Sequence, residues 1–503
     1  MHTFVDPLYR AHKLFANRVA MVCDDVRLTY AETWSRCRRL AGALTRLGVQ
    51  PGERVAILAL NSHQYLEVYL AVPASGRVVV PLNTRHAEPE LRYALEDSGT
   101  RLLITDRDPG ALARTVERVI RLPDDYETLL ATTPEAELGV GLTEDTLAGL
   151  FYTGGTTGVS KGVMLSHRNL IANTTNWLIA TQQGPEDTYL VMAPLFHAAG
   201  SLAVLATVWV GGCQVLIPGF DAAAALDAIA AERATMSLGV PTMIAALAEE
   251  QLAHPRQVGS LRSLSHGGSP IATEVVRRTH AAFPNAELIH AYGATETAPL
   301  VTLLRHEERL VESDLARSCG QAVAGVDVRI VDPSGRELPP GEIGEVIVRG
   351  PNVMPGYWNK PEQTAEALRN GWYHSGDLGA MTAQGHIFLV DRAKDMIISG
   401  GENVYSTEVE EVLYQHPAVL EAAVFGVPDA RWGEAVHAVV VPRPGHEVDA
   451  ISLMAFCREH IAGYKVPKQI DLRRDPLPKS GPGKVLKRAL RAPFWAGHTA
   501  QIN

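Results

Sequence analysis

The sequence predicts an α/β fold in which helices cover mostly parallel sheets, and three observations support this prediction. Apolar runs typical of buried strands alternate with helical patterns between residues 29 and 104. A glycine- and threonine-rich stretch, Phe151–Gly162, follows another apolar run. A charged segment with paired glycines, Asp391–Asn403, separates the long first part of the chain from a shorter second part and indicates a hinge between two domains.

Each of the early elements has its own signal. Thr29 and Glu32 have the spacing of a capping box, and apolar residues follow at helical period until a glycine at 48. The predicted strands after this helix are 54–60, 77–81 and 102–104, and the predicted helices between them are 64–74 and 89–97.

The second half of the chain shows two further patterns. Short alternating strands at 326–331, 344–348 and 386–390 indicate a small β-rich subdomain. Tyr373–Asp377, which lies among them, is typical of a turn when taken alone. Beyond the hinge, helices at 407–414 and 451–460 alternate with strands at 421–425 and 435–441, which predicts a small α+β domain.

Composition excludes several classes of protein. The 503 residues are 46% hydrophobic, which is typical of a globular protein with a large core, and the length favours more than one domain. The net charge of −10 argues against a nucleic-acid-binding protein. The five cysteines have no metal or redox spacing, and the N-terminus lacks a signal-peptide pattern, so we expect a reduced, cytoplasmic protein.

One uncharged segment, Ala198–Phe220, raises the question of a membrane span. Glycines and Pro218 interrupt it, and basic residues do not cluster at its flanks. The sequence therefore predicts a helix at 201–210, a turn and a strand at 214–217 inside a soluble core, with no integral membrane segment.

Phe151–Gly162 is the most informative stretch of the sequence. It contains four glycines, three threonines, a serine and Lys161. Glycines let backbone N–H groups turn inward, and the hydroxyls and the lysine add donors, so the stretch suits an anionic phosphate ester. It is not a loop of the G-x-x-x-x-G-K-[ST] kind, because Gly162 follows the lysine. Composition alone favours the alternative reading, a flexible surface turn.

A second informative stretch, Tyr292–Glu296, follows the apolar run Leu288–Ala291. The ring of Tyr292 offers a face for stacking on adenine, and the hydroxyl of Thr295 is a donor for a phosphate. A carboxylate beside phosphates needs a cation, so Glu296 suggests Mg²⁺, which prefers oxygen ligands.

Together these motifs resemble the adenylate-forming superfamily, in its acyl-CoA synthetase branch. The glycine-rich stretch resembles the family's phosphate loop, [ST]-S-G-T-T-G-x-P-K-G, with Gly154 for the usual serine and Ser160 for the usual proline. The first change removes a hydroxyl donor and the second makes the loop less rigid, yet we expect a working loop. Tyr292–Glu296 matches the family's Y-G-x-T-E motif in full. The matched motifs run in family order from residue 151 to residue 485.

The resemblance implies a role for each matched position. The positions that hold ATP are Thr153, Gly154, Gly155, Thr156, Thr157, Gly158, Lys161, Gly268, Ser269, Ala291, Tyr292, Gly293, Asp377 and Arg392, of which the last two contact the ribose. The metal ligands are Glu296 and Thr156, and the catalytic residues are Lys484, Thr295, Glu296 and His197. The positions bordering the acyl pocket are His197, Ala198, Gly267 and Ala291. Lys394 is the hinge, and Gly400 and Gly401 present a loop to the thiol of coenzyme A.

The resemblance also implies an architecture and a reaction. We expect an N-terminal adenylation domain, residues 1–391, made of two αβ-layered sheets plus the β-rich subdomain, and a mobile lid, residues 392–503. ATP and Mg²⁺ would activate a carboxylic acid as acyl-AMP with release of pyrophosphate, and coenzyme A would then displace AMP.

The identity of the acid rests on weaker signals. Small residues near the expected pocket, at 198–200, 267 and 291, favour a medium- or long-chain fatty acid. An aryl acid of the coumarate or benzoate kind and a carrier protein in place of coenzyme A stay open as alternatives. A non-catalytic nucleotide sensor and a homodimeric assembly stay open as well.

Overall fold

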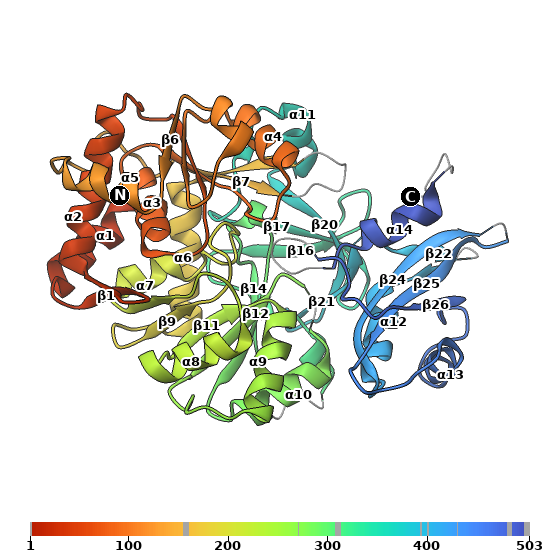
Figure 1. The fold of residues 1–503 in the computed structure, drawn as a ribbon. Helices are drawn as coiled ribbons and strands as arrows, with labels where there is room; N and C mark the ends of the chain where they lie inside the picture. The colour runs from red at the N-terminus through yellow and green to blue at the C-terminus, as the bar shows by residue number, and fades with distance from the viewer. Residues whose placement is uncertain are drawn as a thin grey trace.

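The computed structural model describes residues 3–153, 160–269, 271–306, 313–392, 395–399, 402–429, 431–479 and 485–496. Its strands form four sheets. Figure 1 shows two of them in a large body formed by the first part of the chain, a third between this body and the C-terminal part, and the fourth in the C-terminal part, drawn in blue.

The first sheet has seven strands in the order β18-β8-β7-β4-β3-β5-β6. Strands β7, β4, β3, β5 and β6 run parallel, while β8 and β18 are antiparallel additions at one edge. The strands are β3 (Arg54–Leu58), β4 (Val78–Pro81), β5 (Leu102–Thr105), β6 (Arg118–Arg121), β7 (Leu147–Thr153), β8 (Lys161–Ser166) and β18 (Gly356–Tyr357). The helices nearby in sequence are α2 (Tyr30–Arg46), α3 (His63–Ala74), α4 (Glu88–Ser98), α5 (Asp124–Ala131), α6 (His167–Thr181) and α11 (Pro361–Ala367).

The second sheet has nine strands in the order β15-β14-β13-β12-β11-β9-β10-β1-β2. They are β1 (Val19–Cys23), β2 (Val26–Thr29), β9 (Thr188–Val191), β10 (Cys213–Leu216), β11 (Met236–Gly239), β12 (Ser263–Gly267), β13 (Glu287–Tyr292), β14 (Thr302–His306) and β15 (Gln321–Ala322). The associated helices are α1 (Val5–Phe15), α7 (Val204–Val210), α8 (Ala222–Glu232), α9 (Pro241–Ala253) and α10 (Thr273–Ala282). The short 3-10 segments are η1 (Gly110–Arg114), η2 (Thr295–Thr297) and η4 (Asp314–Arg317).

Two smaller sheets complete the molecule. The β-rich one contains β16 (Asp327–Val331), β17 (Gly344–Arg349), β19 (Leu368–Arg369), β20 (Trp372–Met381) and β21 (Ile387–Arg392). The C-terminal one contains β22 (Ile397–Ser399), β23 (Glu402–Val404), β24 (Val419–Asp429), β25 (Gly433–Pro442) and β26 (Gln469–Leu472), with helices α12 (Ser406–Gln415), α13 (Ala450–His460) and α14 (Lys487–Trp495).

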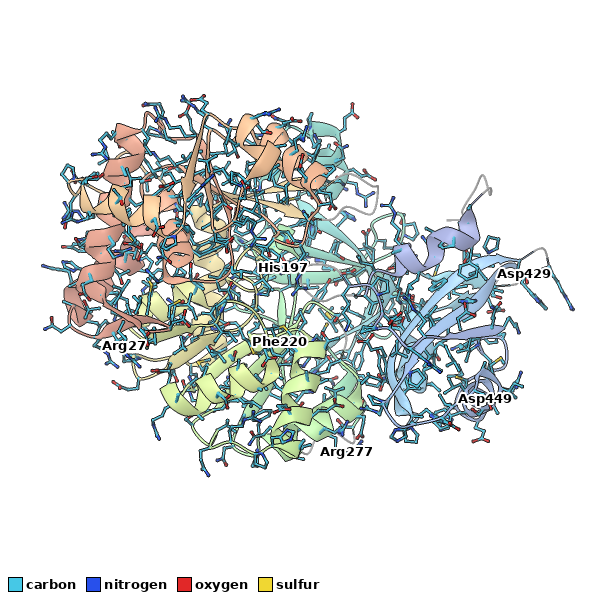
Figure 2. The ribbon with its side chains drawn as sticks, in the orientation of Figure 1. Arg27, His197, Phe220, Arg277, Asp429 and Asp449 are labelled. Atoms are coloured by element: carbon cyan, nitrogen blue, oxygen red, sulfur yellow. The ribbon has the colours of Figure 1, made fainter. Side chains whose placement is uncertain are left out.

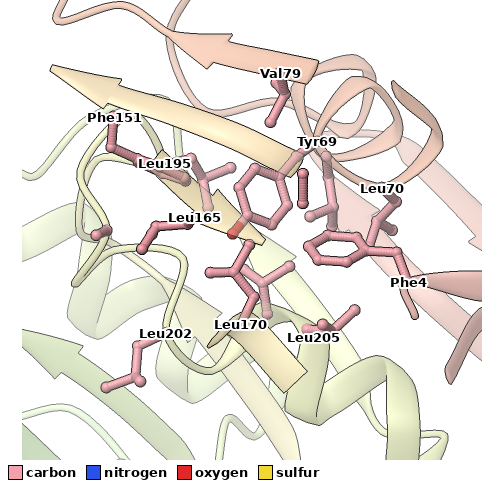
Figure 3. Packing of buried hydrophobic residues seen from close by; sticks show 14 of the residues in the cluster. Phe4, Tyr69, Leu70, Val79, Phe151, Leu165, Leu170, Leu195, Leu202 and Leu205 are labelled. Atoms are coloured by element: carbon pink, nitrogen blue, oxygen red, sulfur yellow. The ribbon is translucent and has the colours of Figure 1, made fainter. Parts of the chain in front are cut away.

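The largest hydrophobic core lies between the two large sheets. Figure 3 shows Phe4 and Tyr69 packing near Leu170 and Leu205, which come from four different helices or their flanks. Burial of this apolar surface is the main force that holds the two sheets together. The C-terminal part has a separate core around α12, β24 and β25, as expected for a second domain.

The predicted fold class is confirmed, including the layered sheets, the β-rich subdomain and the smaller C-terminal domain. The capping box at Thr29 and Glu32 is present at the start of α2. None of the helices that the structure describes combines the length and the apolar character needed to cross a bilayer. All five cysteines are free.

Two local details differ from what the sequence pattern suggests. The helix predicted from residue 201 begins only at Val204, because residues 198–203 form turns around Gly200, where a Cβ would lie 2.0 Å from the carbonyl oxygen of Pro194. The segment Tyr373–Asp377, which is typical of a turn when taken alone, is part of β20. Gly376 has a φ of +70°, and the pairing with β17 shifts its register nearby, so the strand is irregular where the turn signal lies.

Candidate functional site

The two ends of the glycine-rich loop are held together by strand pairing. Thr153 ends β7, Lys161 begins β8, and the two are directly paired. The hydroxyl of Ser160 donates a hydrogen bond of 2.6 Å to the carbonyl oxygen of Thr153. The Ser160 hydrogen bond therefore holds the base of the loop together. It replaces part of the rigidity that the expected proline would give. The residues between, 154–159, lie outside the described chain.

Tyr357 contacts both Lys161 and Glu296. The ammonium of Lys161 lies 4.8 Å from the centre of the Tyr357 ring, within the range of a cation–π contact. The hydroxyl of Tyr357 donates to Oε1 of Glu296 at 2.9 Å. Burial, together with the Glu296 carboxylate, raises the pKa of Tyr357, so the phenol keeps its proton and acts as the donor. Tyr357 thus lies between Lys161, at the end of the loop, and the carboxylate expected to bind metal.

The backbone that carries Glu296 is fixed by Asn352. The Asn352 amide donates to the carbonyl oxygens of Thr297 and Leu300, at 2.9 and 2.8 Å, and is fully buried. The amide N–H of Met354 donates to the carbonyl oxygen of Glu296 at 2.8 Å. These bonds satisfy a short, irregular segment that follows β13, and they hold its side chains in one place.

Gly293 is required by close packing. A Cβ at this position would lie 1.7 Å from the carbonyl oxygen of Pro299. The chain can therefore fold back beside the end of β13 only with a glycine here.

Tyr292, the last residue of β13, contacts Asp377. The hydroxyl of Tyr292 donates to Oδ2 of Asp377 at 2.8 Å. Burial and the nearby carboxylate raise the pKa of Tyr292 well above its ordinary value. Arg392 is the residue paired with Asp377 across β20 and β21. Tyr292 is therefore brought close to the paired positions 377 and 392, which lie far from it in the sequence.

The ends of β12 and β13 place the small residues side by side. Gly267 pairs with Ala291, and a Cβ on Gly267 would lie 2.3 Å from the carbonyl oxygen of Ala291. Gly268 follows with a φ of +84°, a conformation that favours glycine. Ser269 is half-buried. The small size of Gly267 and of Gly200 is thus explained by backbone packing, which weakens the sequence argument for a wide aliphatic pocket.

His197 lies near the middle of the molecule in Figure 2. Its Nδ1 accepts a hydrogen bond of 3.3 Å from the backbone N–H of Ala199, so the proton of the neutral ring is on Nε2. Ala198 is buried and lines a small cavity together with Tyr69, Asn173 and Ser201. Thr295 is half-buried in η2, beside Glu296.

Several predicted residues lie outside the described parts of the chain. They are Gly154, Gly155, Thr156, Thr157, Gly158, Lys394, Gly400, Gly401 and Lys484. The described residues that flank Lys484 pair with each other. Lys479 and Val485 form an isolated antiparallel β-bridge, and the N–H of Leu486 donates to the carbonyl oxygen of Pro478 at 2.8 Å.

Sequence reasoning missed Tyr357 and Asn352. Tyr357 is 61 positions from Glu296, and Asn352 is 55 positions from Thr297. Neither shows a spacing signal in the sequence, since both act through contacts that only the folded chain creates.

Comparison with known proteins gives consistent results. The profile of the family described as "AMP-binding enzyme" matches residues 8–358, and that of "AMP-binding enzyme C-terminal domain" matches residues 408–484. A feruloyl-CoA synthase from an Amycolatopsis species is 45% identical over 97% of this chain and 98% of its own length. A long-chain-fatty-acid–CoA ligase of Bacillus subtilis is 33% identical over 95% of this chain and 92% of its own.

Solved structures of related enzymes superpose on nearly the whole of this chain. ATP-bound MatB from Rhodopseudomonas palustris superposes with a TM-score of 0.90 at 33% identity, covering 98% of this chain and 99% of its own. The o-succinylbenzoate-CoA synthetase MenE of Bacillus subtilis, in complex with its acyl-adenylate, gives 0.88 at 32% identity, covering 99% and 98%. Apo MatB gives 0.80, covering 98% and 99%.

Proposed function

This chain belongs to the AMP-binding enzyme family and is an AMP-forming acid–CoA ligase, and on that premise we propose that its acid substrate is aromatic. The observation that carries the proposal is the 45% identity to feruloyl-CoA synthases along 97% of the chain. Relatives named for fatty acids are 33–35% identical. Ferulic acid is therefore the first substrate to test.

A fatty acid is the second candidate. The sequence argument for it rested on small residues, and close packing explains two of them, Gly200 and Gly267. What still favours it is the group of fatty-acid ligases among the relatives. One of these, from Streptomyces coeruleorubidus, is named for transfer to an acyl carrier protein, so the thiol acceptor also has to be tested.

The first chemical step that we propose is attack of the acid's carboxylate on the α-phosphorus of ATP. The new bond joins a carboxylate oxygen to phosphorus, and pyrophosphate leaves with the electrons of the broken phosphoanhydride bond. Thr153 and Lys161 would hold the outer phosphates, Tyr292 would stack on the adenine and Asp377 would bind the ribose. Thr295 and Lys484 would stabilise the charge that develops at the α-phosphate. Positioning and charge stabilisation suffice, since this route forms no covalent bond with the enzyme.

The residues present fit Mg²⁺. Glu296 is a carboxylate beside the phosphate loop, and one of its oxygens is held by Tyr357. The other oxygen is of the kind that Mg²⁺ prefers, and Thr156 is the second proposed ligand. When bound, the ion would neutralise phosphate charge. The chain's own part is to keep the Glu296 carboxylate oriented.

The second step is attack of the coenzyme A thiolate on the acyl carbon, which breaks the bond to AMP. We propose that residues 392–503 turn about Lys394 between the two steps, so that the loop at Gly400 and Gly401 replaces Lys484.

The better superposition on ATP-bound than on apo MatB supports an arrangement suited to nucleotide binding. Direct contacts join the two parts: Arg443 binds Glu249 at 2.7 Å, and the Ser406 N–H donates to Asp391 at 2.6 Å.

A pyrophosphate-release assay over a panel of acids tests the proposal. The panel contains ferulic, coumaric and benzoic acids and fatty acids of increasing length, each with and without coenzyme A. We expect the highest kcat/KM with ferulic or coumaric acid and formation of the CoA thioester. A preference for fatty acids would refute the aromatic assignment while leaving the enzyme class intact. Product release independent of coenzyme A would indicate a carrier-protein acceptor. Absence of pyrophosphate release with every acid would indicate a nucleotide sensor.

A further inference from the structure

Three histidines converge from three neighbouring strands on one face of the nine-stranded sheet. His266 on β12 pairs directly with His290 on β13, and His306 on β14 lies opposite Leu288, two positions before His290. The ring centres are 4.6, 5.4 and 6.0 Å apart, so the rings form a triangle. Nitrogens from the three rings all lie within 4.8 Å of one another. Figure 1 shows these strands in the green part of the large body, beside α9 and α10.

Four of the six ring nitrogens of this triangle lack a hydrogen-bond partner in the described part of the chain. All three side chains are buried, and both nitrogens of His266 and both of His306 have no hydrogen-bond partner among the described residues. A neutral imidazole has one N–H donor and one lone pair, and burying either without a partner costs free energy. Such a cluster in the interior of a protein calls for a bound species that satisfies it.

His290 has the hydrogen bond that orients a ligating histidine. Its Nδ1 lies 3.3 Å from the carbonyl oxygen of Ser318. Because a carbonyl only accepts, the proton is on Nδ1, and the lone pair of Nε2 is left for another partner. A histidine that binds a metal commonly donates its other N–H to a carbonyl in this way.

Burial keeps the three rings neutral. It lowers the pKa of His290 to about 4 and that of His306 to about 3, and it lowers the pKa of His266 well below the ordinary value. At neutral pH the lone pairs are therefore not blocked by protons, which is the condition for metal binding.

We propose that His266, His290 and His306 form a binding site for a late first-row divalent cation, of which Zn²⁺ is the best match. Three imidazoles suit this class of ion, whereas Mg²⁺ prefers oxygen. The site is therefore distinct from the proposed Mg²⁺ site at Glu296. The ring planes lie within 20° of one another, so the rings must turn to direct three lone pairs at one ion, and a water molecule would complete the coordination.

The triangle lies close to the strand ends that lead into the proposed nucleotide site. His266 directly precedes Gly267, and His290 lies two residues before Tyr292. An ion bound here would cross-link the ends of the two strands that lead into the proposed nucleotide site. It would stabilise the folded chain, since metal bound only by the native state favours that state.

Metal titration of the full-length protein tests the site. The protein is freed of metal with a chelator, dialysed without nucleotide against Zn²⁺, and analysed for bound zinc by mass spectrometry and for thermal stability. We expect one Zn²⁺ per chain and a raised Tm. His306→Phe keeps the size of the ring, removes a ligand and should weaken binding by about 100-fold or more.

Two control variants separate this site from other metal-binding groups. His254→Ala removes a histidine whose side chain is 72% exposed, and Glu296→Gln removes the proposed Mg²⁺ ligand. Both should retain the zinc. Co²⁺ provides a readout that needs no variant, because bound Co²⁺ gives visible absorption bands that Zn²⁺ should abolish one for one. Wild-type protein without stoichiometric metal, or equal binding by His306→Phe, would overturn the proposal and leave water as the partner of these nitrogens.

Discussion

At the scale of single residues, the proposed site depends on how one carboxylate is held. Tyr357 binds Glu296 through its hydroxyl and Lys161 through its ring. These two contacts are separable, because phenylalanine keeps the ring and loses only the hydroxyl. The pair therefore allows the orientation of the carboxylate to be tested without disturbing the lysine.

Tyr357→Phe should raise the Mg²⁺ concentration needed for half-maximal pyrophosphate release by about tenfold, since an outer hydrogen bond to a metal ligand is lost. Tyr414→Phe is a matched control, because the Tyr414 hydroxyl donates at 3.3 Å to the carbonyl oxygen of Ala422 in the C-terminal part of the chain. An Mg²⁺ dependence equal to that of the wild type would show that Tyr357 does not orient Glu296.

Lys484→Ala should lower the rate of acyl-adenylate formation by about 10²–10³, as for loss of one charge-stabilising group. Thioester formation from supplied acyl-adenylate should survive, because in the proposed second position of the lid this lysine has left the site. The two half-reactions are measured separately by pyrophosphate release and by thioester yield. Lys468→Ala, an exposed lysine of the same domain, is the control. Equal losses in both half-reactions would contradict a lid with two positions.

At the scale of elements, the segment after β13 is stable only because another segment satisfies its backbone. Asn352→Ala leaves two buried carbonyl oxygens, of Thr297 and Leu300, without their donor. We expect a loss of about 2 kcal/mol in the free energy of unfolding and a lower rate of pyrophosphate release. Urea denaturation measures the first quantity. Asn285→Ala, at an exposed position, should change neither.

Elements set by local sequence were the ones that could be predicted. The capping box of α2 and the apolar run of β3 depend on neighbouring residues, and both were predicted within a few positions. The course of β20 was not, because Gly376 and Asp377 are held in a strand by pairing with β17 and β21. Local turn propensity was overridden by contacts distant in sequence.

The same distinction applies to the site. Thr153, Lys161, Tyr292 and Asp377 could be proposed from the sequence because their motifs are contiguous in the chain. Tyr357, Asn352 and the histidine triangle were not, because each depends on strands brought together by folding. The roles assigned to all of the predicted site residues stay predictions, as does the domain boundary at residue 391.

At the scale of the whole molecule, buried neutral histidines make stability depend on pH. Burial lowers the pKa of His167 and of His290 to about 4 and that of His306 to about 3. These histidines take up protons more readily in the unfolded chain than in the folded one. Their contribution to the free energy of unfolding is therefore present above pH about 6.5 and is lost as the pH falls towards the pKa of the folded state. His63 acts in the opposite direction, because Cys23 and Glu127 outweigh its burial and raise its pKa to about 9.

Between pH 7 and pH 5, one such histidine should cost about 2 kcal/mol of the free energy of unfolding. Urea denaturation at the two pH values, with a chelator present, measures the change. His306→Phe should show a pH dependence smaller by about that amount, while the effect of His63 is common to both proteins and cancels. An unchanged pH dependence in the variant would mean that the pKa of His306 is the same in the folded and the unfolded protein.

The central claim is that a carboxylate attacks the α-phosphorus of ATP at this site. The most direct measurement uses ferulic acid labelled with ¹⁸O in its carboxylate, together with ATP, Mg²⁺ and coenzyme A, and determines by mass spectrometry where the label goes. The account predicts AMP that carries one ¹⁸O atom and a CoA thioester that retains the other. Thioester formed with unlabelled AMP, or label found in inorganic phosphate, would contradict it.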